Sequence, residues 1–297
     1  MARFAIFALL LLAWPWAAKG ADDFAWPANA TAAISLTFDD GRPSQYLVGA
    51  GLFAEYGARA TFYVLPDAVR GGGRRDMLWS LVGLGVTDGW RDMLAGGHEI
   101  GSHTVNHPCS AAFEWVRPEN ATQAYTAGRM ERELRDARTM IADLLKTDPV
   151  SFSYPCGETR IGQDAISYVP LAREVYQSAR LFQHGAKAGP TDNDPLEVDL
   201  WEIRAVSMDD LSFEELLPMI RHARSRGNWI VLGGHEIGDA GAQTTRVETL
   251  ERIIRYSQDP ANGMWLAPVR EVVDHIRWRR SIAMLPDRAS QVSVLGR

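Results

Sequence analysis

The sequence has few cysteines, no low-complexity tract and no long run of like charge. The two cysteines, Cys109 and Cys156, allow at most one internal disulfide. The remaining composition is ordinary for a globular protein and includes enough apolar residues for a sizeable core. At 297 residues the chain is long enough for one large domain or two small ones.

The main body also lacks a membrane-length apolar run, but the first residues need separate treatment. An apolar segment from Phe4 to Ala18 follows Arg3 and precedes small residues. The segment is short for a membrane span and is typical of a signal peptide. We therefore expect residues 1–20 to be a signal peptide and the protein to be periplasmic or secreted. The alternative is an uncleaved N-terminal anchor.

The charge balance argues against two kinds of partner. Removal of residues 1–20 takes away Arg3 and Lys19 and leaves 29 basic against 37 acidic residues, a net charge of −8. Such an acidic chain is a poor candidate for binding nucleic acid or an anionic membrane surface. We expect a neutral or positively charged substrate, no stable membrane insertion after signal removal, and a monomer.

The hexapeptide GGHEIG occurs twice, at Gly96–Gly101 and at Gly233–Gly238. The flanking sequences share no further similarity, so the chain contains no internal repeat of domain size. The two histidines, His98 and His235, therefore have to be assigned separately.

Strand and helix patterns alternate along residues 33–280, which predicts parallel strands joined by helices. Residues 168–199 show no readable pattern. The expected strands are Ala33–Phe38, Arg59–Leu65, His98–Ser102, Val150–Pro155, Trp201–Val206, Trp229–His235 and Trp265–Ala267. The expected helices are Pro43–Tyr56, Thr122–Lys146, 213–227, Thr245–Ser257 and one ending near Arg280.

Titratable side chains follow several of these strands. Asp39 and Asp40 follow the first, His103 and His107 the third, and His235 a later one. In parallel α/β folds the carboxyl ends of the strands share one rim, where active sites lie. The H-x-x-x-H spacing would put both rings on one face of a helical turn. Two imidazoles and a carboxylate suit an open divalent-metal site, although the spacing alone is weak evidence.

These motifs carry a family resemblance. TFDDG at Thr37–Gly41, SHTVNHP at Ser102–Pro108, the YPCG segment and a late strand ending in histidine resemble the polysaccharide deacetylases, carbohydrate esterase family 4. The resemblance implies a single domain over residues 21–297 with a distorted, seven-stranded (β/α) barrel. It also implies metal-dependent hydrolysis of acetyl groups on a sugar polymer, with the N-acetyl of an amino sugar the foremost expectation.

The resemblance also assigns roles. It makes Asp39 the general base and His235 the general acid, and it places the backbone N–H of Cys156 at the oxyanion. It makes Asp40, His103 and His107 the ligands of a divalent metal, with zinc the foremost expectation. Such a cation would polarise the acetyl carbonyl and activate a water molecule. The substrate-contacting residues would include Tyr154, Pro155 and Leu232, while Trp115 could stack on a sugar ring or pack internally.

Two family features are altered. Ser153 stands where an arginine that pairs with the base is common, and we expect Arg204 to supply that arginine instead. The aspartate partner of His235 is not apparent, and Asp209 and Asp199 are both candidates.

The position of each GGHEIG copy separates the two histidines. His235 follows a strand and belongs at the catalytic rim, whereas His98 begins a strand at the opposite end, so we expect no chemical role for His98. The SHTVNHP motif and the YPCG segment should meet at one metal, so we expect a Cys109–Cys156 disulfide. The alternative is a buried free thiol at Cys156.

Three alternatives to polymer N-deacetylation stay open. They are O-acetyl ester hydrolysis on xylan-like polymers, hydrolysis of a small N-acyl compound, and carbohydrate binding without catalysis.

Overall fold

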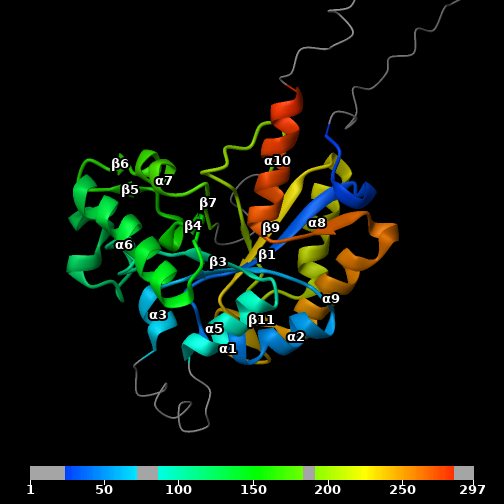
Figure 1. Ribbon diagram of the computed structural model, residues 1–297, viewed down its shortest axis with the longest axis horizontal. Coiled ribbons are helices and arrows are strands. Elements are labelled where there is room, and N and C mark those ends of the chain that lie inside the picture. Colours follow the sequence, from blue (N-terminus) through cyan, green and yellow to red (C-terminus); the bar gives the residue numbers. More distant parts are fainter. Residues whose placement is uncertain (1–23, 72–85, 183–190, 284–297) are drawn as a thin grey trace, which may run out of the picture.

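The structure is a computed structural model that describes residues 24–71, 86–182 and 191–283. Within these ranges, a curled sheet of parallel strands forms the centre of the molecule (Figure 1). Its strands run side by side in the order β7-β4-β3-β2-β1-β9-β8, and β12 pairs with the first residues of β1. Their bounds are β1 (Ala32–Phe38), β2 (Thr61–Val64), β3 (Glu99–Ser102), β4 (Ser151–Ser153), β7 (Ser178–Arg180), β8 (Val206–Ser207), β9 (Trp229–Gly234) and β12 (Met264–Leu266).

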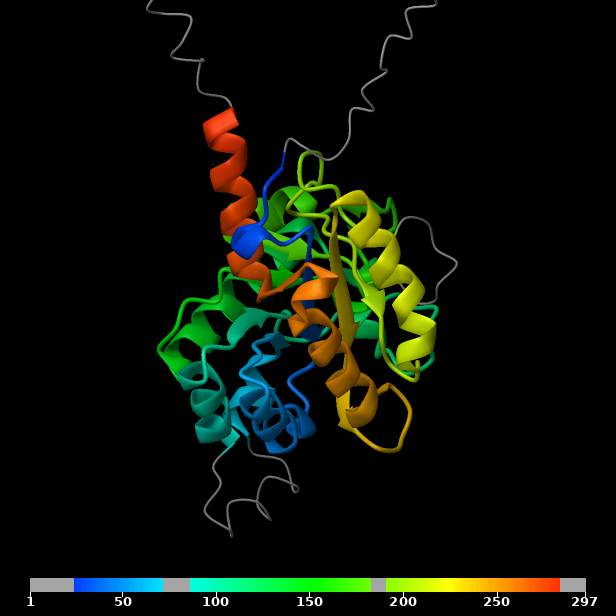
Figure 2. The same cartoon turned by 90° about the vertical axis from the view of Figure 1, so that its right-hand side faces the viewer.

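Helices surround the outer side of this sheet (Figures 1 and 2). They are α1 (Pro43–Leu47), α2 (Gly49–Glu55), α3 (Pro66–Arg70), α5 (Val86–Ala95), α6 (Ala127–Leu145), α7 (Val169–Val175), α8 (Phe213–Arg226), α9 (Val247–Gln258) and α10 (Val269–Ala283). Two small pairs lie apart from the sheet: β5 (Arg160–Ile161) with β6 (Ile166–Ser167), and β10 (Glu236–Gly238) with β11 (Thr244–Arg246). Short 3₁₀ helices cover Pro27–Asn29, Pro118–Asn120, Thr122–Ala124, Pro155–Gly157 and Pro260–Asn262.

The sheet curls far enough for its two edges to meet. Arg180 at the end of β7 forms a bridge with Ile203, just before β8. The N–H of Leu181 donates to the carbonyl of Ile203 at 2.8 Å, and the N–H of Ile203 donates to that of Ala179 at 3.0 Å. The expected distorted, seven-stranded (β/α) barrel of a single domain is therefore confirmed. The expected strand Trp201–Val206 is reduced to this bridge and the two residues of β8.

Local sequence signals set the long helices. Thr126 caps α6 by accepting a hydrogen bond from the N–H of Arg129. Ser212 and Glu215 form a capping box at the start of α8, and Gly227 ends it in the left-handed region at φ 71°. The buried apolar residues of α6 recur at helical spacing and form one inward face: Met130, Leu134, Ala137, Ile141 and Leu145.

Both faces of the sheet are covered, since all seven residues of β1 are buried. One cluster packs between the sheet and α8 and α9, and includes Leu36, Leu232 and Leu216. None of the helices in the described ranges combines the length and hydrophobicity of a membrane span. The expected signal peptide, residues 1–20, lies outside those ranges.

Candidate active site

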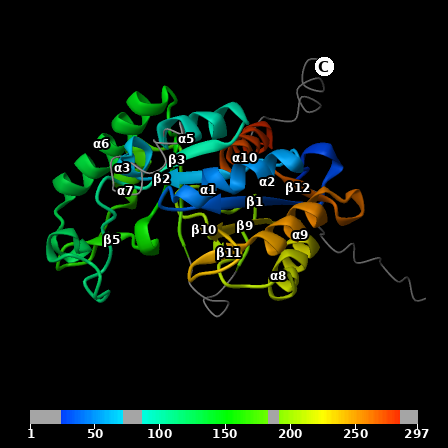
Figure 3. The same cartoon turned by 90° about the horizontal axis from the view of Figure 1, so that it is seen from below.

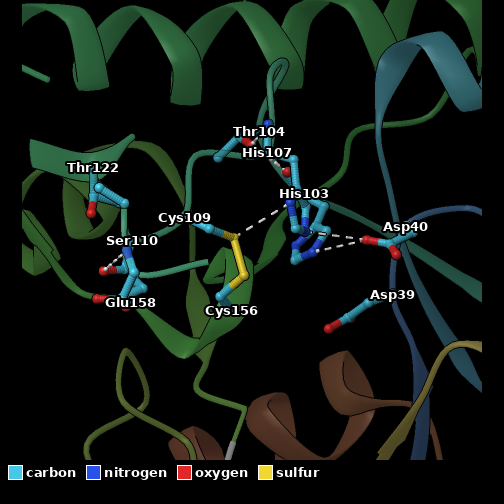
Figure 4. The surroundings of a disulfide bond; sticks show 12 residues. Asp39, Asp40, His103, Thr104, His107, Cys109, Ser110, Thr122, Cys156 and Glu158 are labelled. Carbon is cyan, nitrogen blue, oxygen red and sulfur yellow. Dashed lines mark hydrogen bonds and ion pairs between the residues drawn. A yellow bond between two sulfur atoms is a disulfide. The ribbon is translucent and has the colours of Figure 1, made fainter. Parts of the chain in front are cut away.

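Two aspartates follow the end of β1, and only the Asp40 carboxylate contacts the histidines (Figure 4). Asp39 is 3% exposed and its N–H donates to the carbonyl of Gly234 at 2.9 Å, so it continues the β1–β9 pairing. Asp40 adopts a left-handed backbone, with φ 71°, which turns the chain at once. A non-glycine residue in this region is strained, and such strain is common at functional sites. The turn separates the two carboxylates and gives each its own partners.

Asp40 lies close to the two histidines of the SHTVNHP motif, His103 and His107. Its Oδ1 lies 3.5 Å from Nε2 of His103 and 3.3 Å from Nε2 of His107. This Oδ1 is buried and has no hydrogen-bond partner in the described part of the chain. A buried polar atom without a partner is costly, which points to a missing ligand. One carboxylate oxygen and two imidazole nitrogens facing one point fit a divalent cation.

The protonation of His103 also suits a metal ligand. Its Nδ1 lies 2.8 Å from the carbonyl oxygen of Ser153, which can only accept, so Nδ1 carries the proton. The lone pair is then on Nε2, which faces Asp40. Burial lowers the pKa of His103 to about 4, so the ring is neutral at ordinary pH. A hydrogen bond of this kind orients a ligating histidine.

The segment that carries the two histidines is a tight turn and not the helical turn that the spacing suggested. Thr104 and His107 both have positive φ, at 67° and 51°. The N–H groups of Val105 and Asn106 each donate to Oε2 of Glu133 at 3.0 Å. Glu133 extends from α6 and is buried, so a helix supports the ligand turn. The two rings converge because of this turn, with centroids 4.9 Å apart.

The partner of Asp39 is Arg180 at the end of β7 and not Arg204. The guanidinium of Arg180 is fully buried and donates to Oδ1 of Asp39, and Ser153 donates to Oδ2 at 3.3 Å. Arg180 pairs in register with Ser153 on β4, so the arginine lies one strand away from its usual family position. The small side chain of Ser153 leaves room for it.

The prediction for Arg204 is wrong for a geometric reason. Side chains of an extended segment alternate between its two sides. Ile203 and Ala205 are fully buried, so Arg204 between them is exposed. The sequence reasoning missed Arg180 because it lies within residues 168–199, which showed no readable pattern. The available signal was a lone arginine inside the apolar run Ala179–Phe182.

His235 has a carboxylate partner, which is Asp209 and not Asp199. The ring Nδ1 of His235 lies 2.6 Å from Oδ2 of Asp209. The backbone N–H of His235 donates to Oδ1 of the same aspartate at 3.1 Å. Asp199 instead pairs with Arg173. Burial alone would lower the pKa of His235, but the hydrogen bond to Asp209 and the nearby aspartate charges outweigh it and raise the pKa. The ring is thereby favoured in the protonated form that a general acid requires.

Replacement of Asp209 by asparagine tests this pair. We expect the basic limb of the pH profile of kcat to move to lower pH by about 1–3 units, because the pKa of His235 falls when the charge is lost. Activity that needs protonated His235 is lost as pH rises through its pKa, so a lower pKa moves the loss downward. Asp199→Asn is the matched control and should leave the limb in place. An unchanged limb in Asp209→Asn would contradict the assignment.

The two GGHEIG copies use their glycines differently. A Cβ on Gly233 would lie 2.5 Å from the Phe182 ring, and one on Gly234 would lie 2.8 Å from Oδ1 of Asp209. Gly234 therefore leaves room for Asp209 beside His235, and Gly233 leaves room for the Phe182 ring. In the first copy, Gly97 turns the chain after α5 with φ 82°.

His98 is a structural residue at the far end of the barrel, as expected. It is 8% exposed, and its Nδ1 accepts a hydrogen bond from the N–H of Ala60 at 3.1 Å. Burial and the charge of Arg59 lower its pKa to about 4. Glu99 beside it accepts a hydrogen bond from the N–H of Arg270 at the start of α10, at 2.8 Å.

Cys109 and Cys156 form the expected disulfide, with a Cα separation of 5.8 Å, and a free Cys156 thiol is excluded (Figure 4). The bond joins the segment after the histidine turn to the 3₁₀ turn after β4. Sγ of Cys109 lies 3.5 Å from Nδ1 of His107. The disulfide therefore packs directly behind a candidate metal ligand.

Removal of this disulfide should lower stability. The bond spans a sequence separation of 47 residues. For the Cys109→Ser/Cys156→Ser variant we expect a loss on the order of 4 kcal/mol in the free energy of unfolding in the chain-entropy model. Urea denaturation measures it, and wild-type protein treated with reductant should match the variant. An unchanged unfolding midpoint in both samples would disprove the contribution.

One cavity of about 640 Å³ brings these groups together. Its lining includes the two aspartates, the three histidines of the motifs and Cys156. Two aromatic residues that follow the histidine turn, Phe113 and Trp115, also line it, with rings 5.6 Å apart. Trp115 is 61% exposed, so it is available to a ligand.

Three predicted substrate residues do not line this cavity. Tyr154 is fully buried, and its hydroxyl donates to the carbonyl of Trp201 at 3.0 Å. Pro155 is also buried, and the following residue, Cys156, reaches the cavity instead. Leu232 points outward to the helices from the middle of β9. The apolar contact beside His235 comes from Phe182, with ring centroids 5.3 Å apart.

Comparison with known proteins agrees with this site. The sequence profile of the polysaccharide deacetylase family matches residues 28–169, which include Asp39, Asp40 and both histidines of the turn. A gellan lyase from a Bacillus species is 25% identical over 167 residues. That segment is 56% of this chain but only 5% of the relative, so the chain spans a small part of that protein.

Solved structures share the fold over most of the chain. A candidate polysaccharide deacetylase from Mycobacterium smegmatis is 15% identical, with 90% of this chain and 96% of that chain covered and a TM-score of 0.57. A mutant of BA3943, a carbohydrate esterase family 4 pseudoenzyme with restored enzymatic activity, is 14% identical, with coverages of 82% and 68% and a TM-score of 0.51. With its motifs assembled at one rim, the chain is identified over residues 28–169 as a member of the polysaccharide deacetylase family of hydrolases, carbohydrate esterase family 4.

Proposed function

We propose that this protein is a metal-dependent deacetylase that removes N-acetyl groups from amino sugars of a chitin- or peptidoglycan-like polymer. One observation carries the proposal. The cavity is lined by a candidate metal site and by Asp39 and His235, each of which contacts a partner outside the lining, Arg180 and Asp209 respectively. A binding protein needs no such set, so catalysis is favoured over carbohydrate binding alone.

The residues supply the chemistry as follows. Asp40, His103 and His107 would hold a divalent cation, for which zinc is our proposal. Such a cation supplies Lewis acidity toward a carbonyl oxygen and a nucleophile at neutral pH. Asp39 accepts the proton of the attacking water, while Arg180 and Ser153 hold its carboxylate in place. The N–H of Cys156 is our proposed donor to the developing oxyanion.

The acid favours an amide substrate over an ester. A departing amine leaves poorly without a proton, whereas an alcohol depends less on an acid. His235 lies at the cavity, and its contact with Asp209 favours the protonated ring. The O-acetyl esterase is therefore the second candidate. A small N-acyl substrate is less favoured, because the aromatic pair of Phe113 and Trp115 extends the cavity beyond the catalytic groups.

Export is part of the proposal. The disulfide supports an oxidising compartment, in keeping with the signal-peptide pattern of residues 1–20. We propose a periplasmic or secreted monomer that meets its polymer outside the cytoplasm.

Acetate release tests this function. Purified protein is assayed on acetylated chitooligosaccharides and on acetylxylan, with and without a chelator, alongside the His103→Ala variant. We expect release from the chitooligosaccharides that the chelator abolishes, and metal content that falls in His103→Ala. Release from acetylxylan alone would favour the esterase. No release from either polymer, or equal metal content in both proteins, would contradict the proposal.

A further inference from the structure

Arg42 lies between two carboxylates at the edge of the cavity. Its Nε and Nη2 donate to Oδ2 of Asp40 at 3.1 and 2.9 Å. Its Nη1 donates to Oε1 of Glu236 at 3.4 Å. Glu236 belongs to the second GGHEIG copy, and the family motifs give neither Arg42 nor Glu236 a role. The contact connects the loop after β1 with the chain beyond His235.

The two oxygens of Asp40 thereby face different partners. Oδ2 receives both donors of Arg42, whereas Oδ1 has no hydrogen-bond partner within the described ranges and faces the histidines. The fork of a guanidinium restricts a carboxylate more than a single point charge does. Arg42 therefore leaves Oδ1 as the oxygen available to a cation.

Arg42 is itself held in place. Glu236 also accepts a hydrogen bond from the hydroxyl of Ser44, and that hydroxyl accepts one from the N–H of Ile237 at 3.0 Å. These hydrogen bonds connect the start of α1 to β10, which lies beside it in the view from below (Figure 3). Gln45 adds contacts to the carbonyls of Asp39 and His235 at 2.6 and 2.8 Å.

We propose that Arg42, held by Glu236, is a positioning residue for the metal ligand Asp40. It turns Oδ1 toward His103 and His107 and occupies Oδ2, so that Asp40 offers one oxygen to the metal. The inference rests on the proposed metal site.

A role for Arg42 through its charge and a role through positioning predict opposite effects of its removal on metal affinity. If Arg42 acted only through its charge, its removal would tighten metal binding, because a cation beside a cation site would be lost. If it positions Asp40, its removal weakens metal binding, because the ligand is no longer oriented. Loss of a partner that orients a ligand typically costs about 10–100-fold in metal affinity. The sign of the change therefore separates the two explanations.

The experiment measures zinc affinity by competition with a chromophoric chelator, and the absorption spectrum of the Co²⁺-loaded protein. The variants are Arg42→Gln, Arg42→Lys, Glu236→Gln and the double variant of Arg42→Gln with Glu236→Gln. Arg135→Gln is the matched control, because Arg135 also contacts two carboxylates, Glu131 and Glu174, but lies on the exposed side of α6. Thermal unfolding of the metal-free proteins establishes that each variant is folded.

We expect Arg42→Gln to lose about 10–100-fold in zinc affinity and to change the Co²⁺ spectrum, with Arg135→Gln unchanged. Arg42→Lys should not restore the affinity, because it keeps the charge but not the fork. Glu236→Gln should weaken binding alone but add nothing to Arg42→Gln, since both act through Asp40. Equal or tighter binding by Arg42→Gln, or full recovery in Arg42→Lys, would overturn the inference. A wild type that binds no divalent ion would overturn the proposed function as well.

Discussion

Asp39→Asn is expected to lower turnover by about 10²–10⁴-fold while the protein keeps its metal, because the change removes the general base and leaves Asp40 intact. Asparagine has nearly the same shape, so the cavity keeps its volume. Steady-state kinetics and metal analysis of the same sample measure the two effects together. Turnover close to that of the wild type in a metal-loaded sample would rule out Asp39 as the base.

The same substitution should also cost stability. Arg180 is fully buried and its guanidinium contacts Asp39. Removal of one partner from a buried ion pair typically costs about 3–5 kcal/mol, because the other charge is left unpaired. Arg180→Met combined with Asp39→Asn removes both charges and should recover part of that loss without recovering turnover. This double variant distinguishes the loss of a base from the loss of the fold.

His235→Ala is the second variant for which we expect a large loss, again about 10²–10⁴-fold in turnover with metal retained. The histidine contacts Asp209 and lines the cavity, so its removal takes away the acid without touching a metal ligand. The loss should be larger for an amide than for an activated ester, which leaves readily without a proton. Equal losses on both substrates would argue against an acid role.

His98→Ala provides the matched control, since His98 and His235 occupy the same position in the two copies of the hexapeptide GGHEIG. We expect little change in turnover for folded protein, because His98 lies away from the cavity lining. Its ring accepts the N–H of Ala60, so the substitution should cost about 1–3 kcal/mol of stability. A His98→Ala protein that is folded, metal-loaded and as inactive as His235→Ala would refute the separation of the two copies.

The sequence predicted best those candidate site residues that directly follow a strand. β1, β3 and β9 have strong apolar patterns, and the titratable residues follow them directly. The aspartate pair, the histidine pair and His235 could therefore be placed before any coordinates. The disulfide followed from the expectation that two motifs meet at one metal.

The predictions that were wrong or left open concern contacts between residues on different strands of the sheet. Arg180 reaches Asp39 because β7 lies beside β4, and a three-residue strand leaves too weak a pattern to reveal that pairing. Asp209 could be suggested but not chosen over Asp199, because the choice depends on which of them reaches His235. The predicted substrate contacts failed because Tyr154 and Leu232 point into packed layers, and periodicity alone does not say which layer meets the cavity.

The repeated hexapeptide has a consequence for how this protein responds to acid. Two imidazoles in the same six-residue context have pKa values moved in opposite directions, lowered to about 4 for His98 and raised for His235. Above about pH 4 the first ring is neutral, whereas the raised pKa of the second favours its protonated form. A histidine-selective probe, such as imidazole resonances in a nuclear magnetic resonance titration, would therefore give two well-separated curves from identical local sequences. The surrounding barrel, and not the peptide, decides in which direction the pKa of each histidine moves.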